Sequence, residues 1–444
     1  MEPIVRLKSL LLFLVLFLVV SVGFVVYLFK ALSSPLVFGI DGPYYVLQVE
    51  YLLGHGCLKY LDPPLAFYVL AGFSVLIGDV FLGVKVGSLI VFLLASIPLF
   101  FLVRRLSGSI GGLVAVLSYV FSSYLVRLGF DFLKNAMGLL FLSLFFYMVL
   151  RGLGEDDLRY SIGASLLLIV TGLTHILDFG VGYGFALLLL VFNIVSRNRG
   201  GIKHLLLPVA TSTLLLVAGF TVYTVMGGDP YKALNLLRLM GEETSNITLT
   251  PWELAKTVTP LILGVTGIIL SFRLNGVEKQ VVLAVSIILI ALNTPLIPLQ
   301  YLWRFNLMTA ILAPIILGVL VGLVRDKTIA VAASLVIIGL LLPQFIVQLQ
   351  AVHPSIPEPE YGELRKLVEN LPANTLIIAP DTRLRYWIET LYENVAKKPP
   401  GPTPYPQLIV FDKNPSTRKP WIPPHARKYY SGEYIEAYII TSPR

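Results

Sequence analysis

The sequence predicts an all-α polytopic membrane protein with about eleven transmembrane helices, followed by a small C-terminal α/β domain outside the cytoplasm. Three observations lead to this prediction. Of the 444 residues, 56% are hydrophobic and only 14% are charged, and the mean hydropathy of +0.81 is far above that of soluble globular domains. Long apolar runs recur as far as Gln350, and short basic connections separate them at alternate positions.

The apolar runs are long enough to cross a hydrocarbon core of about 30 Å. The first run follows two basic residues, but it is too long for the core of a signal peptide and lacks a small-residue cleavage site, so it predicts an uncleaved anchor. Two neighbouring runs in the middle of the chain could also form one broken pair, namely 161–176 and 179–196. The full set lies near residues 7–31, 82–103, 110–127, 134–151, 161–176, 179–196, 204–226, 252–272, 280–297, 303–324 and 328–350.

Basic residues in alternate connections predict the topology. By the positive-inside rule these connections face the cytoplasm. The amino terminus is then cytoplasmic, and an odd number of spans places the loops 32–81 and 227–251 and the tail from His353 outside. The basic connections carry Arg6/Lys8, Arg104/Arg105, Arg151/Arg159, Arg197/Arg199/Lys203, Arg273/Lys279 and Arg325/Lys327.

A compositional break at His353-Pro-Ser-Ile-Pro357 predicts a division into a membrane domain, 1–352, and an extracytoplasmic α/β domain, 353–444. In the tail, 361–370 reads as a short amphipathic helix and 397–406 as a proline-rich loop. The expected strands are 375–379, 407–411 and 434–441.

The first outer loop contains a further apolar segment, from Asp62-Pro-Pro-Leu65 to Gly78. It is too short to cross the membrane comfortably, so it is expected to lie along the outer interface.

Charge and cysteine content exclude some classes of function. The formal charge of +8 is spread over short connections that topology explains, which does not favour nucleic-acid binding. The single cysteine, Cys57, allows no intramolecular disulfide, Cys-based zinc site or iron–sulfur cluster.

Asp41 is the candidate catalytic residue. It lies in Phe38-Gly-Ile-Asp-Gly-Pro-Tyr-Tyr45, just beyond the first run. A carboxylate there could act as a general base toward a hydroxyl group. It could equally cap the turn or helix that Gly42 and Pro43 begin, and the sequence leaves both roles open.

Other ionisable residues near the outer ends of the runs are candidates for substrate binding, because such groups are costly near a membrane unless they face water or a partner. Asp131 could cap the following helix or pair with Arg127 or Lys134, and by itself it favours such a structural role. His175 and Asp178 bracket an outer turn, where they could bind a metal or a substrate or form a hydrogen-bonded corner.

Lys85 and Arg304 each lie at the outer end of a run, at the depth of a phosphate headgroup. Either side chain could instead snorkel to the interface without any function. The aromatic residues around Arg304 also fit an ordinary aromatic belt.

The order of these features resembles the GT-C glycosyltransferase superfamily. Asp41-Gly-Pro-Tyr-Tyr45 and Asp62-Pro-Pro-Leu-Ala-Phe-Tyr68 look like the first outer loop of protein mannosyltransferases and lipid A aminoarabinose transferases. Gly83-Val-Lys-Val-Gly-Ser88 looks like the helix that follows this loop. The segment 127–135 resembles a second acidic motif, and Trp303-Arg-Phe305 is similar to a late outer arginine before a membrane helix.

The resemblance implies inverting transfer of a sugar from a polyprenyl-phosphate donor in the membrane to an acceptor glycan, lipid or protein on the outer face. Asp41 would be the base, and Lys85 and Arg304 would stabilise the leaving phosphate. The implied substrate-binding residues are Tyr44, Tyr45, Asp62, Lys85, Asp131, His175, Asp178 and Arg304.

The sequence also departs from the superfamily at two places. Gly42 follows Asp41, where many members have a second acidic residue, so a divalent metal cofactor is left open and no metal ligand is assigned. The tail lacks the Trp-Trp-Asp-Tyr-Gly signature of oligosaccharyltransferases, so transfer of a whole glycan to asparagine is not supported.

Two other classes of protein compete with this interpretation. A transporter would also have many helices with charges, but the charges here gather at the outer ends and no inverted repeat is visible. A noncatalytic membrane scaffold with a receptor-like tail would leave Asp41 and Arg304 dispensable.

Overall fold

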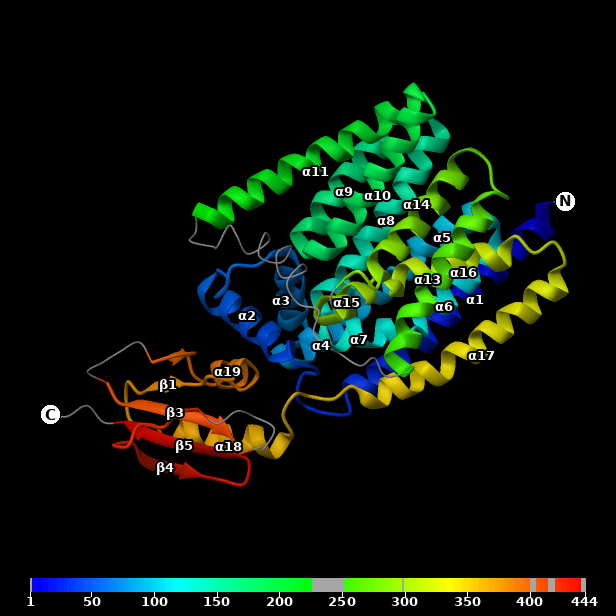
Figure 1. Cartoon of the computed structure of the whole chain (residues 1–444). Helices are drawn as coiled ribbons and strands as arrows, with labels where there is room; N and C mark the ends of the chain where they lie inside the picture. The colour runs from blue at the N-terminus through cyan, green and yellow to red at the C-terminus, as the bar shows by residue number, and fades with distance from the viewer. Residues whose placement is uncertain (1, 226–250, 298, 400–404, 414–419, 441–444) are drawn as a thin grey trace.

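The computed structural model describes residues 2–225, 251–297, 299–399, 405–413 and 420–440. A bundle of long helices makes up most of the molecule, and a small domain with a β-sheet lies at one end of it, far from the amino terminus (Figure 1). We call this end of the bundle the tail-domain end. Of the loop 227–251 that was predicted to be outside, residues 227–250 lie outside the described part of the chain.

The helices of the bundle follow the predicted apolar runs. They are α1 (Glu2–Ala31), α4 (Val80–Leu94), α5 (Ser96–Ser107), α6 (Ser109–Val120), α7 (Ser123–Asp131), α8 (Leu133–Glu155), α9 (Leu158–Thr174), α10 (Ile176–Val195), α11 (Arg199–Val225), α13 (Pro251–Ser271), α14 (Gly276–Asn293), α15 (Leu299–Asn306), α16 (Thr309–Gly322) and α17 (Lys327–Ala351).

Length and composition allow seven described segments to cross a membrane, and the pair of α6 and α7, which is bent by 50°, raises the number to eight. The remaining predicted runs coincide with shorter apolar helices, namely α9, α16 and the Val258–Ser271 part of α13. α9 and α10 meet at His175, and α10 is by itself long and apolar enough to cross a membrane, so the run 179–196 does not need the run 161–176 to complete a span. The prediction of an all-α polytopic membrane protein is confirmed.

The basic connections gather at the end of the bundle opposite the tail domain. Arg105 pairs with Glu155 across 3.4 Å, and His204 hydrogen-bonds to Asp156 at 2.6 Å. These contacts join connections that are far apart in the sequence. Their common location agrees with the alternation of charge from which the topology was predicted.

The first loop after α1 forms two short helices, α2 (Gly42–His55) and α3 (Leu65–Ile77). Local sequence sets their ends: Gly56 and Gly78 follow the helices with φ of 75° and 80°, which glycine adopts without strain. The Asp79 carboxylate then accepts the Leu82 N–H at 2.6 Å and starts α4. α3 corresponds to the apolar segment expected at the outer interface.

The tail folds as an α/β domain with the elements α18 (Glu358–Glu369), β1 (Leu376–Ile378), α19 (Thr382–Glu389), β2 (Val395–Ala396), β3 (Gln407–Asp412), β4 (Arg427–Ser431) and β5 (Ile435–Ile440). The sheet has the order β2-β1-β3-β5-β4. β1 is parallel to β2 and β3, whereas β5 is antiparallel to β3 and β4. The predicted helix and three strands are confirmed, while α19, β2 and β4 were not predicted.

The tail domain and the first loop share one hydrophobic core. Residues of α2 and α3, such as Val46 and Phe67, are buried in the same cluster as Trp387 and Ile388 of α19. Burying apolar surface between the two segments fixes their relative position.

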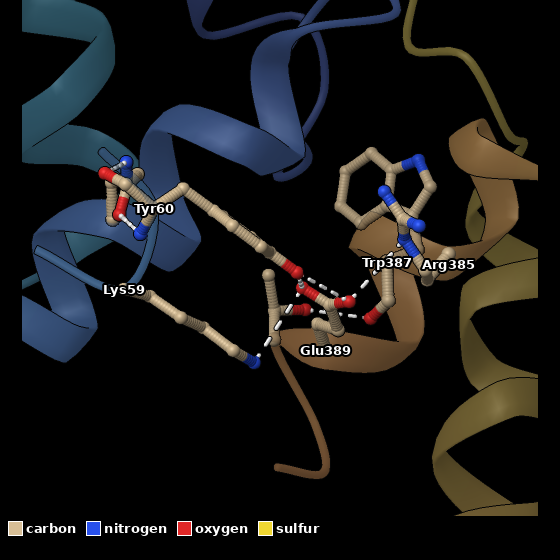
Figure 2. Close-up of polar contacts among 7 residues, drawn as sticks. Lys59, Tyr60, Arg385, Trp387 and Glu389 are labelled. Atoms are coloured by element: carbon tan, nitrogen blue, oxygen red, sulfur yellow. Dashed lines mark hydrogen bonds and ion pairs between the residues drawn. The ribbon is translucent and has the colours of Figure 1, made fainter. Parts of the chain in front are cut away.

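A buried carboxylate adds polar contacts to this interface. The Tyr60 hydroxyl lies 2.8 and 2.9 Å from the two oxygens of Glu389, whose side chain is only 1% exposed. Lys59 and Arg385 pair with the same carboxylate at 3.5 and 3.4 Å. Figure 2 shows Lys59 and Tyr60 of the loop pointing toward Glu389 on α19. The loop is therefore attached to the tail domain on one side and to the bundle on the other.

Candidate active site

The segment that carries Asp41 is held between the bundle and the tail linker. Gly39 has a φ of +72°, and its N–H donates to the His353 carbonyl at 3.0 Å. A Cβ atom at Gly39 would lie 2.0 Å from Asp131 Oδ1 and 2.8 Å from Asp131 Cα. Because Gly39 has no side chain, Asp131 at the end of α7 can contact the backbone there. This contact lies two residues before Asp41.

Asp41 occupies the cap position of α2, but its side chain makes no capping hydrogen bond. Its main-chain carbonyl accepts the Tyr45 N–H at 3.2 Å, so the helix uses the backbone of Asp41 and leaves the carboxylate free. Burial raises the pKa of Asp41, whereas the nearby charges of Arg304 and Lys134 lower it. The carboxylate thus lies in a partly dry site next to two cations.

Asp62 is engaged by a dense network. It accepts hydrogen bonds from Tyr44 at 2.6 Å and from Lys134 of α8. Gln48 donates to the Tyr44 hydroxyl at 3.0 Å. Asp62 thus links α2 and α8 on one side of Asp41.

Tyr45 is buried beside this network. Its ring lies 6.2 Å from that of Phe67. Tyr45 therefore packs the start of α2 against α3.

Two guanidinium groups share the ring of Trp303. Arg127 lies 5.0 Å and Arg304 lies 5.1 Å from its centroid, which are distances typical of cation–π contacts. Arg127 also pairs with Asp131 at 3.5 Å. Arg304 is exposed and makes no ion pair within the described part of the chain. Its charge is therefore available to an anion from outside the protein.

The structure assembles most of the predicted site residues, since Asp41, Tyr44, Tyr45, Asp62, Asp131 and Arg304 lie around one point at the tail-domain end. Of the two partners considered for Asp131, Arg127 is the one that pairs with it, while Lys134 pairs with Asp62. Lys134 and Trp303 also lie in the site, although neither was predicted from the sequence to belong to it. A signal was present, because Lys134 lies within the acidic motif 127–135 and Trp303 directly precedes Arg304.

Lys85 does not join this cluster. Its ammonium group donates to the main-chain carbonyls of Ser34 at 2.8 Å and Pro35 at 3.4 Å, and the residue is 7% exposed. The charge of Lys85 therefore holds the end of α1 to α4 and is not directed at the Asp41 carboxylate.

His175 and Asp178 pair with each other at the junction of α9 and α10. His175 Nδ1 lies 3.0 Å from Asp178 Oδ2, and this oxygen occupies the space beside Gly138 of α8 that a side chain would otherwise fill. Asp178 is fully buried. The pair matches the hydrogen-bonded corner that was one of the alternatives.

Within the ranges that the structure describes, no three His, Cys, Asp or Glu side chains come close enough together to hold a metal ion. No metal ligand is assigned.

Part of the sequence and most of the fold resemble known proteins. The profile of the dolichyl-phosphate-mannose-protein mannosyltransferase family matches residues 62–223, which include Asp62, Asp131 and Lys134 but not Asp41 or Arg304. No curated protein matches the sequence significantly.

Two solved structures resemble the whole fold. ArnT from Cupriavidus metallidurans, bound to undecaprenyl phosphate, has a TM-score of 0.60 at 14% identity, and the match covers 96% of this chain and 99% of ArnT. The apo oligosaccharyltransferase from Archaeoglobus fulgidus has a TM-score of 0.62 at 13% identity, covering 89% of this chain and 69% of that protein.

A second structure of the archaeal oligosaccharyltransferase, with zinc and sulfate, gives a TM-score of 0.59 at 14% identity and is matched over 86% of this chain. The chain spans 62% of the length of that protein. Identities this low show a common fold, and the family profile adds a match at the level of sequence. The chain therefore resembles these membrane glycosyltransferases, in sequence over residues 62–223 and in fold over most of its length.

Proposed function

We propose that the protein transfers a sugar from a polyprenyl-phosphate donor to a hydroxyl group of an acceptor on the outer face of the membrane, with inversion at the sugar. One observation carries the proposal. The Asp41 carboxylate is left free by the helix that it precedes, and it lies within the electrostatic influence of Arg304 and Lys134. A base beside two cations suits a reaction that removes a proton and releases an anionic leaving group.

In the proposed reaction, Asp41 accepts the proton of the acceptor hydroxyl as the acceptor oxygen forms a bond to the anomeric carbon. The bond between that carbon and the phosphate oxygen breaks, and the electron pair leaves with the lipid phosphate. Arg304 stabilises the negative charge that develops on the phosphate, and Lys134 adds a second positive charge nearby. Attack on the face opposite the phosphate inverts the anomeric configuration.

The depth of the cluster supports a lipid-linked donor. A polyprenyl chain remains in the bilayer, so its phosphate is held at the interface, and α2 and α3 form a platform at the end of the spanning helices. The ArnT structure contains undecaprenyl phosphate. The archaeal oligosaccharyltransferase has been captured with an acceptor peptide. By analogy, this chain would use a lipid-phosphate sugar and an acceptor that approaches from the tail domain.

The proposed orientation follows from charge. The basic connections at the opposite end of the bundle would face the cytoplasm, and the cluster around Asp41 and the tail domain would face outward in the cell membrane. The donor would then be used on the outer face.

The arrangement favours an enzyme over the two competing classes. A transporter binds its substrate near the middle of the membrane, whereas the cations and carboxylates here meet at one end. A scaffold would not require a carboxylate that does not cap its helix within the electrostatic influence of Arg304.

A transfer assay on the purified protein tests the proposal. Mass analysis of glycans and of accumulated sugar-lipids after deletion of the gene would first identify the donor. With that donor, Asp41→Asn should reduce transfer by about 10²- to 10⁴-fold and leave donor binding largely intact. Glu369→Gln, an exposed substitution on α18, is the matched control and should transfer at the unmutated rate. Transfer by Asp41→Asn at the unmutated rate would show that this residue is not the base.

A further inference from the structure

A cavity lies outside the Asp41 cluster, between the tail domain and the linker that follows α17. Its volume is about 820 Å³, within the usual range of ligand sites. Its lining includes four acidic and two basic side chains, namely Glu358, Glu360, Asp412, Glu433, Arg383 and Lys413. Because His353 and Pro354 also line it and pair with Gly39, the cavity adjoins the segment that leads to Asp41.

The two basic side chains in the cavity are already used by the protein. Arg383 pairs with Asp412, and its other terminal nitrogen donates to the Ser355 carbonyl at 3.2 Å. Lys413 donates to the Ser431 hydroxyl at 3.1 Å and to the Gly432 carbonyl. Both cations are thus held by groups of the protein, although Arg383 Nε has no hydrogen-bond partner among the described residues.

The acidic side chains of the cavity, unlike Arg383 and Lys413, have oxygen atoms that could still accept hydrogen bonds from a ligand. Glu360 is only 3% exposed, and among the described residues its Oε1 has no hydrogen-bond partner. A buried acceptor without a partner is unfavourable unless a ligand or water satisfies it. Glu358 and Glu433 are exposed and add carboxylates at the rim.

Neighbouring negative charges also favour a positively charged ligand group near Glu360. The pKa of Glu360 is raised to about 7. Burial is the main cause and the Asp412 carboxylate the second, while Arg383 opposes the shift. A positive group brought by a ligand would relieve this crowding.

We propose that this cavity binds the amine-bearing, hydroxyl-rich part of a glycan. The ammonium group pairs with Glu360, and the hydroxyl groups donate to the carboxylates of the rim. The role of this glycan as the acceptor rests on the proposed function, because the cavity adjoins the chain that positions Asp41. Binding itself does not depend on sugar transfer.

Calorimetric titration of the full-length protein in detergent, without donor, tests the inference. The probes are a linear tetramer of β-1,4-linked glucosamine and its fully N-acetylated counterpart, which has a similar shape but no ammonium groups. The unmodified protein should bind the amine form at least about tenfold more tightly. Glu360→Gln should weaken binding of the amine form by about tenfold, since a hydrogen bond to a charged group is lost. Glu369→Gln, on the same helix but exposed, should bind like the unmodified protein.

Equal binding of both probes, or undiminished binding by folded Glu360→Gln, would overturn the inference, as would the absence of binding. If Glu360→Gln does not fold, Glu433→Gln at the rim replaces it: weaker binding of the amine form supports the site and unchanged binding contradicts it. A protein that transfers sugar but does not bind the tetramer overturns this inference alone. A protein that binds the tetramer but transfers no sugar overturns only the proposed function.

Discussion

Asp131 fills the space in which Gly39 would carry a side chain. A Cβ atom on Gly39 would lie 2.8 Å from Asp131 Cα, a main-chain atom that cannot rotate away. This contact joins the loop after α1 to the end of α7, and it lies two residues from Asp41. The position of the proposed base thus depends on the absence of a side chain at residue 39.

Gly39→Ala is therefore expected to destabilise the protein and to reduce transfer. The positive φ alone costs about 1–2 kcal/mol for a residue with a side chain, and the clash with Asp131 adds to it. Gly54→Ala is the matched control: it lies in α2 with no atom within 4 Å of the new Cβ, and alanine should stabilise the helix by about 0.5–1 kcal/mol. Thermal unfolding and transfer rates measure both effects. Equal melting temperatures for the two variants would contradict the close contact.

The pH dependence of transfer should reveal the environment of Asp41. Burial raises the pKa of this carboxyl group, and a general base works only when ionised. The rate should therefore fall as the pH drops through the raised pKa, at a higher pH than for an ordinary aspartate. Arg304→Gln removes a charge that lowers this pKa, so its profile should shift to higher pH as well as show weaker handling of the donor. Arg159→Ala, at the opposite end, should leave the profile unchanged, and an unshifted profile for Arg304→Gln would argue against its influence on Asp41.

Glu389 should hold the first loop to the tail domain. Glu389→Gln removes the charge that Lys59 and Arg385 share, and breaking a buried ion pair costs about 3–5 kcal/mol. The variant should melt at a lower temperature, and limited proteolysis should cut the linker 352–357 faster because the docked state opens more often. Glu369→Gln, which changes an exposed side chain of α18, serves as the control. Equal cleavage rates for the two variants would show that Glu389 does not anchor the domain.

Cysteine labelling should establish the orientation in the membrane. Cys57 is exposed in the first loop, so an impermeant thiol reagent should label it in intact cells. In a Cys57→Ser background, a cysteine at Glu369 should also react, whereas one at Ser196, in a basic connection, should react only after permeabilisation. The reverse pattern would place the Asp41 cluster on the cytoplasmic side and would refute the proposed use of an outward-facing donor.

Several features of this protein could be predicted from the sequence because they are local. Most apolar runs are long enough to form a membrane helix on their own, and a helix satisfies its backbone hydrogen bonds within hydrocarbon. The strands at 375–379, 407–411 and 434–441 were similarly visible as apolar segments, whereas β4, with its basic and polar side chains, forms only because β5 lies beside it. Asp41 stood out as a carboxylate just beyond the first membrane helix.

The partners of these residues depend on the tertiary structure. Asp62 and Lys134 are 72 positions apart, and no periodicity in the sequence indicates that they pair. Lys85 and Arg304 look alike in the sequence, since each is a cation near the end of an apolar run. The fold surrounds Lys85 with main-chain carbonyls and leaves Arg304 exposed beside Trp303. The sequence by itself determines which segments enter the membrane, because transfer from water to lipid is a property of each segment, whereas the packing of the helices decides which charges remain free to act.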